Sequence, residues 1–103
     1  MIKKYFVLDE TPCHPGKYMI RLNYNAFPSN INTSGSFNIL PARLLRLQYA
    51  EYLRYCRDVC DAEIIGKNCY YPIPFFKNNQ SAKELVALLN ARMALVATHW
   101  RKE

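Results

Sequence analysis

Strict alternation of apolar and polar residues marks the N-terminal third of the chain. Between residues 17 and 27 every second side chain faces the same way, and the apolar set is Tyr18, Ile20, Leu22, Tyr24 and Ala26. A period of two over this length predicts a half-buried β-strand. The apolar run within residues 3–8 predicts an earlier strand, and the prolines and glycine of residues 11–16 are typical of a turn. We therefore expect an antiparallel hairpin with one face on the core.

The middle of the chain changes to a helical period. Residues 28–38 are small and polar and predict a loop, whereas residues 41–61 repeat at 3.6 residues per turn, with Pro41 suited to the first turn. The predicted apolar face of this helix consists of Leu45, Tyr49, Tyr52, Leu53, Cys56, Val59 and Cys60. Leu44 and Leu47 do not fit this face. A bend or a restart near Leu47 is therefore an alternative to one continuous helix.

Two short strands are predicted after this helix. Ala62–Ile65 is apolar and β-branched, and residues 66–68 have the composition of a turn. The segment from Tyr70 to Phe76 is aromatic and extended, and its two prolines exclude a helix. Because a proline cannot donate to a ladder, this second strand is expected at an edge or at a bulge.

The last helix is predicted over residues 81–100. Ser81 followed by Glu84 has the spacing of a capping box. From Leu85 to Ala97 the only polar residues are Asn90 and Arg92, so this helix should be buried deeply or contact two layers. The alternative is that part of its apolar surface forms a homodimer or partner interface.

These elements follow the order ββαββα, which predicts an α+β fold with a small antiparallel sheet packed by two helices. A chain of 103 residues with 50% apolar residues fits one compact domain over residues 1–103. The apolar run near the N-terminus is too short for a secretory signal, and no run approaches a membrane span, so we expect a cytoplasmic protein without a membrane partner.

Positive charge is the feature that most directly suggests a function. The formal net charge is +6, and a single helix over residues 41–61 would place four arginines within an arc of roughly 80°. Arginine forks bind phosphate and carboxylate groups, and the polar and aromatic residues near position 70 would add stacking and hydrogen bonds. The predicted anion-binding residues are Arg43, Arg46, Arg54, Arg57, Lys67, Asn68, Tyr70 and Tyr71. The alternative is an ordinary solvated helix face.

Metal and catalytic sites find weaker support. Cys56 and Cys60 are four residues apart on the predicted helix, and Cys13 with His14, or Cys69, would complete a zinc set. No C-x2-C knuckle is present, so burial in the core is the preferred interpretation of Cys56 and Cys60.

The sequence does not contain the residue patterns that catalytic sites usually need. The acids Asp58, Asp61 and Glu63 precede Lys67, but a nuclease needs its acid and lysine two positions apart on one strand, and here Gly66 interrupts them. Adjacent Cys13 and His14 point apart, and three glycines form no phosphate-binding loop. No cofactor is predicted.

The sequence therefore predicts a small, non-enzymatic binding protein. Its expected partner is nucleic acid, a nucleotide or an acidic, nucleic-acid-handling protein, and blocking by occupancy would suit a phage or mobile-element inhibitor of host defence. The first alternative is a protein-interaction or homodimerisation module that uses the C-terminal helix. The second is a nuclease-like enzyme.

Overall fold

The computed structural model describes residues 3–12, 14–27, 39–66 and 72–100, with the side chains of residues 98–100 left out of the description. The predicted α+β class is confirmed, with two antiparallel hairpins and the helices between and after them. The elements are β1 (Phe6–Thr11), β2 (His14–Leu22), the 3₁₀ turn η1 (Tyr24–Ala26), α1 (Leu40–Leu44), α2 (Tyr49–Cys60), β3 (Glu63–Ile65), β4 (Ile73–Phe75) and α3 (Gln80–Trp100).

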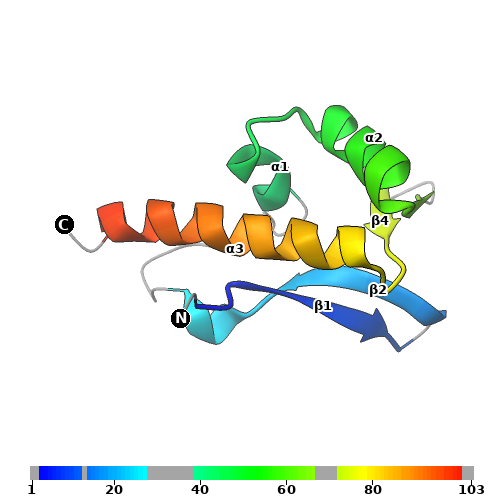
Figure 1. The fold of residues 1–103 in the computed structure, drawn as a ribbon, viewed down its shortest axis with the longest axis horizontal. Coiled ribbons are helices and arrows are strands. Elements are labelled where there is room, and N and C mark those ends of the chain that lie inside the picture. The colour runs from blue at the N-terminus through cyan, green and yellow to red at the C-terminus, as the bar shows by residue number, and fades with distance from the viewer. Residues whose placement is uncertain (1–2, 13, 28–38, 67–71, 101–103) are drawn as a thin grey trace.

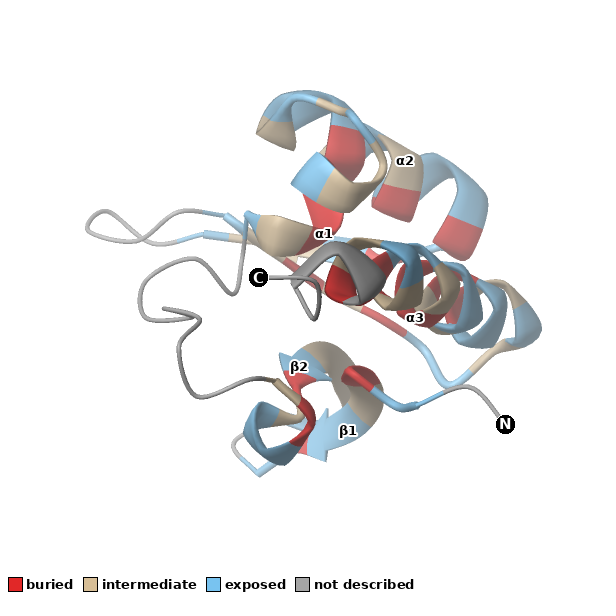
Figure 2. Ribbon diagram, turned by 90° about the vertical axis from the view of Figure 1, so that its left-hand side faces the viewer, coloured by how far each residue is buried: buried red, intermediate tan, exposed pale blue. Residues whose placement is uncertain are grey.

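Helix α3 lies between the other elements, with the β1–β2 hairpin on one side and α1 and α2 on the other (Figure 1). Its buried stripe, Leu85, Leu89, Met93 and Ala97, follows the helical period of three and four residues and packs into the core (Figure 2). The prediction that this helix contacts two layers is therefore confirmed. In the described ranges, no helix is long and apolar enough to cross a membrane.

Asn90 explains why a polar residue interrupts the apolar stripe of α3. Its side chain is only 7% exposed, and its Oδ1 accepts hydrogen bonds from the N–H groups of Tyr5 and Phe6, both at 2.7 Å. Its Nδ2 donates to the carbonyl of Phe6 at 3.1 Å. A buried amide thus satisfies three backbone groups at the start of β1, which would otherwise be desolvated without partners.

The first hairpin has a tighter turn than predicted. Residues 11–16 were expected to form the turn, but Thr11 already pairs with His14, so β1 and β2 are separated by residues 12–13 alone. The pairing shifts after Glu10, and the extra residues of β2 form a bulge. Gly16 has a φ of 81° there and donates its N–H to Glu10 Oε2 at 2.8 Å. Pro15 and Gly16 lie in this bulge, and Pro12 stays in the turn, so the turn itself is shorter than residues 11–16.

The second strand is shorter than its alternation predicts. Ile20 and Leu22 face the core as expected, but β2 ends at Leu22 and the chain turns through η1. The prediction for Tyr24 was wrong: its side chain is 60% exposed, although Ala26 is buried. The 3₁₀ turn replaces the period of two with a period of three, so Tyr24 leaves the core face.

The second hairpin pairs β3 with β4, as predicted, in the register Glu63–Phe75, Ile64–Pro74 and Ile65–Ile73. It joins the first hairpin through Tyr18 and Phe76, whose backbone groups exchange two hydrogen bonds at 2.8 and 2.7 Å. Strand β4 begins at Ile73, later than the expected start at Tyr70. Tyr70 and Tyr71 of the predicted strand, the turn residues Lys67 and Asn68, and the polar loop at 28–38 lie outside the described residues.

The predicted helix over residues 41–61 is two helices. The Leu47 N–H donates to the Ala42 carbonyl at 2.9 Å and the Arg46 N–H to the Arg43 carbonyl at 3.0 Å, the pattern of a Schellman motif that ends α1. Helix α2 then begins with the Gln48 N–H donating to Glu51 Oε1 at 2.9 Å. The continuous helix was therefore wrong and the restart near Leu47 is confirmed.

Two smaller predictions about the helices were also wrong. Val59 is 52% exposed, because α2 buries a narrower side consisting of Tyr52, Cys56 and Cys60. The cap of α3 is Asn79, whose Oδ1 accepts the Ala82 N–H at 2.9 Å, in place of the predicted Ser81–Glu84 box. Asn79 also donates to the Cys60 carbonyl at 3.1 Å, which ties the start of α3 to the end of α2 and favours this register.

Candidate anion-binding site

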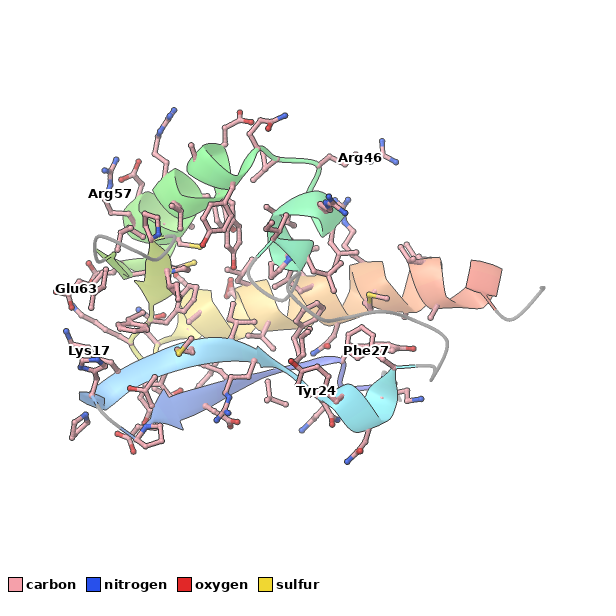
Figure 3. The ribbon with its side chains drawn as sticks, turned by 180° about the vertical axis from the view of Figure 1, so that it is seen from behind. Lys17, Tyr24, Phe27, Arg46, Arg57 and Glu63 are labelled. Atoms are coloured by element: carbon pink, nitrogen blue, oxygen red, sulfur yellow. The ribbon has the colours of Figure 1, made fainter. Side chains whose placement is uncertain are left out.

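The four arginines of the predicted arc fall into two separate groups. Arg43 lies on α1 and Arg46 is the second residue after its end, whereas Arg54 and Arg57 belong to α2. Figure 3 shows Arg46 and Arg57 at opposite ends of the α1–α2 layer. A single arc was expected only for a continuous helix, and the Schellman motif between α1 and α2 turns the two groups apart.

The first group gains a third arginine from α3. Arg43, Arg46 and Arg92, here called the arginine triad, surround a hollow of about 300 Å³ whose other lining residues are Leu44, Leu95 and Val96. Within the described ranges, no acidic residue lines this hollow. None of the three arginines forms an ion pair with another described residue. The triad is therefore an uncompensated cluster of positive charge built from two sequence-distant segments.

Arg92 was missed as a site residue by reasoning from the sequence. The signal that could have found it is its position: it is the only charged residue between Leu85 and Ala97 in an otherwise apolar helix. In the structure it is exposed, and its Nη1 lies 3.4 Å from the Leu44 carbonyl, to which it donates. A cation at this place also interacts favourably with the partial negative charge at the C-terminal end of α1.

Arg46 occupies a strained backbone position. Its φ of 59° is left-handed, which is the conformation of the C′ residue in a Schellman motif. Glycine adopts this conformation without cost. A side chain here costs about 1 kcal/mol relative to the right-handed conformation. A strained non-glycine residue that carries a solvent-exposed guanidinium into a charged cluster is the kind of feature that accompanies function.

The second group, Arg54 and Arg57, is partly neutralised. It lines a hollow of about 540 Å³ together with Glu63 and aliphatic residues. Arg57 Nε donates to Asp58 Oδ1 at 2.9 Å, and this hydrogen bond lowers the pKa of Asp58 and raises the pKa of Arg57. Arg54 forms no ion pair with the described residues, but the group as a whole is mixed in charge.

The three acids weighed for a nuclease are dispersed by separate ion pairs. Asp58 binds Arg57, and Glu63 binds Lys17 on the first hairpin (Figure 3). Asp61 accepts a hydrogen bond from Lys77 Nζ at 2.6 Å, which raises the pKa of Lys77. Over the described part of the chain, no three His, Cys, Asp or Glu side chains come together around a metal position.

Cys56 and Cys60 lie in the core. Both are fully buried on the side of α2 that faces the interior, and Cys60 Sγ lies 3.7 Å from the Ser81 carbonyl, to which it donates. Burial raises the pKa of the Cys56 thiol to about 12 and also raises that of Cys60. Thiols that hold their protons this firmly are poor metal ligands and poor nucleophiles near neutral pH.

The remaining candidates are less informative. Cys13, Cys69, Lys67, Asn68, Tyr70 and Tyr71 lie outside the described residues, so their proposed roles stay predictions. His14 is exposed and its ring lies against Phe75, with ring centroids 5.3 Å apart.

A larger hollow of about 930 Å³ follows the outer face of the first hairpin, but its Asp9 and Arg21 form an ion pair at 4.0 Å. Its charge is balanced, so it gives no preference for an anion.

The fold and the site together define a small α+β protein with a local, uncompensated arginine cluster. Comparisons of this chain with protein-family models, curated proteins and solved structures found no match. The function must therefore be argued from the site itself.

Proposed function

We propose that this protein is a small, non-enzymatic binding protein that holds an anionic partner at the arginine triad and acts by occupying the partner's surface. The observation that supports this proposal is the convergence of Arg43, Arg46 and Arg92 on one hollow that no acid among the described residues lines. Guanidinium groups without carboxylate partners are available for charge-assisted hydrogen bonds to an external anion. Occupancy is also how a phage or mobile-element inhibitor of host defence would act.

A macromolecular anion fits this site better than a free nucleotide. All three arginines and Leu95 are exposed, so the hollow is a surface feature and not an enclosing pocket. None of the described residues that line it is aromatic, so none of them can stack on a base, and the sequence contains no glycine-rich phosphate-binding motif. A site of this kind suits a partner that covers it with a surface of its own.

The test compares two variants that change the net charge equally. Arg43→Glu/Arg46→Glu reverses two of the three charges of the triad. Arg54→Glu/Arg57→Glu changes the second group by the same number of charges. We measure retention on immobilised polyglutamate and on a short DNA duplex over a salt titration. We expect salt-dependent retention of the wild type on at least one polyanion, weakened roughly tenfold or more by the triad variant alone.

Two results would contradict the proposal. One is the absence of retention at low salt on either polyanion, and the other is an equal loss in both variants, which would indicate net charge and not a site. Circular dichroism and urea unfolding of both variants provide the control, because these exposed side chains should leave the fold unchanged.

The homodimerisation alternative finds less support. Helix α3 buries its main apolar stripe, including Leu85, Leu89 and Met93, within the chain. What remains outside is limited to residues such as Leu88, 39% exposed, and Leu95. Most of the apolar character that suggested an interface is thus used for intramolecular packing.

A further inference from the structure

The triad hollow has an apolar floor as well as a charged rim. Three of its six lining residues are the aliphatic Leu44, Leu95 and Val96, and the Leu95 side chain is 67% exposed. Covering exposed aliphatic side chains removes apolar surface from water and is favourable for a partner that brings apolar surface of its own. The hollow therefore offers an apolar contact surrounded by positive charge.

This combination argues against the nucleic-acid backbone as the partner. A phosphodiester chain is charged and strongly hydrated, and it gains little from covering leucine and valine side chains. A polyanionic strand also needs positive charge along its path, but Asp58 and Glu63 interrupt the charge at the second arginine group. Stacking would require aromatic residues, and none of the described residues that line the two hollows is aromatic.

We infer that the partner is an acidic protein segment in which two or more carboxylates flank a leucine-sized apolar anchor; this inference rests on the proposed function. Carboxylates match the planar arginine forks of Arg43, Arg46 and Arg92, and the anchor packs on Leu95 and Val96. Arginine around a small apolar centre is also typical of protein–protein interfaces, whose central contacts supply most of the affinity.

A displayed library of random peptides tests this inference without presupposing the partner. The wild-type protein is the bait, and the Arg43→Glu/Arg46→Glu variant removes peptides that bind elsewhere. We expect the remaining peptides to share acidic residues beside Leu, Ile or Met. Remaining peptides without acids, or without an apolar residue between them, would overturn the inference.

A matched pair of leucine variants tests the apolar floor. Leu95→Gln and Leu88→Gln remove an exposed leucine from the same helix with a residue of good helix propensity, and only Leu95 lines the hollow. For a selected peptide, we expect Leu95→Gln to weaken binding roughly tenfold and Leu88→Gln to change it less than about twofold, measured by fluorescence anisotropy. Equal effects of the two variants would contradict the proposed contact.

The outcome separates this inference from the proposed function. If a short DNA duplex binds in a triad-dependent manner while the library yields no acidic peptides, the partner class is wrong and the anion site stands. If neither a polyanion nor a peptide depends on the triad, the proposed function itself fails.

Discussion

Two regions of the molecule differ in how they use polar groups. One is the contact between α3 and the first hairpin, and the other is the layer of α1 and α2. At the first, Asn90 is buried and its amide satisfies three backbone groups of Tyr5 and Phe6. At the second, Arg43 and Arg46 meet Arg92 of α3 in the exposed arginine triad, which has no carboxylate partner among the described residues, and Arg46 has a left-handed backbone. One region pairs its buried polar groups within the fold, and the other exposes three guanidinium groups, of which that of Arg92 donates a hydrogen bond within the fold, to the Leu44 carbonyl.

This difference indicates where function can be sought in a structure. Polar groups that stabilise the fold have their partners inside it, as Asn90 and Asn79 do. Polar groups that act outside the fold are left unpaired, and they cost stability that a partner restores. The comparison predicts that substitutions near α3 and the hairpin change stability, whereas those in the triad change binding.

The largest stability effect is expected for Asn90→Leu. Leucine has a similar volume but leaves the N–H groups of Tyr5 and Phe6 and the Phe6 carbonyl without partners in the interior. Unsatisfied buried groups cost about 1 to 3 kcal/mol each and overlap in effect, so we expect a loss of roughly 4 kcal/mol in urea unfolding. Asn25→Leu, at an exposed asparagine, should cost less than about 0.5 kcal/mol. Similar losses in both would show that the Asn90 contacts do not anchor the hairpin.

The next effect concerns the apolar stripe beside Asn90. Leu89→Ala removes a fully buried side chain, and we expect a loss of about 3 kcal/mol from transfer and cavity terms. Leu88→Ala is the matched control, because this neighbour on α3 is partly exposed and should lose under about 1 kcal/mol. Urea unfolding at constant m-value measures both. If Leu88→Ala were the more harmful change, the orientation of α3 would be wrong.

Alkaline pH should weaken the core around α2. Burial raises the pKa of the thiol of Cys56 to about 12, while the unfolded thiol titrates near its ordinary value of about 8.5. Stability is therefore complete below the unfolded pKa and falls as the pH rises toward 12, by roughly 1 to 2 kcal/mol at pH 10 from this group alone. Burial raises the pKa of Tyr49 to about 12 as well, which acts in the same direction above pH 10.

The pH dependence is measured by urea unfolding at pH 7 and pH 10. In Cys56→Ala the alkaline loss should be smaller than in the wild type, because one of the titrating groups is absent. Alkylation of the native protein at pH 8 should also spare Cys56, which is read by mass spectrometry of its peptide. Rapid labelling at that site would contradict the burial of its thiol.

The sequence predicted the parts of the fold that depend on periodicity. Alternation identified Ile20 and Leu22 as core residues, and the apolar length of the last helix indicated its central position. The break between α1 and α2 was only partly foreseeable, because a Schellman motif usually carries glycine where this chain has Arg46. The triad needed the structure, since Arg92 is distant in sequence and meets Arg43 only through tertiary packing.

The smallest effect on stability is expected for Arg46→Gly. This variant also tests most directly whether the triad affects binding and not stability. Glycine relieves the left-handed strain but gains freedom in the unfolded chain, so we expect stability to stay equal or to rise by at most about 1 kcal/mol. Binding to the anionic probe should fall by roughly tenfold, because one of the three guanidinium groups is lost. Asp61→Gly is the control, since Asp61 has a φ of 56° and lies outside the triad. Asp61→Gly relieves the same kind of strain but also removes the exposed ion pair with Lys77, so its stability should change by less than about 1 kcal/mol in either direction, with binding unchanged or improved. Unaltered binding in Arg46→Gly would mean that the strained arginine serves the turn alone, and the contrast between the two regions would lose its clearest example.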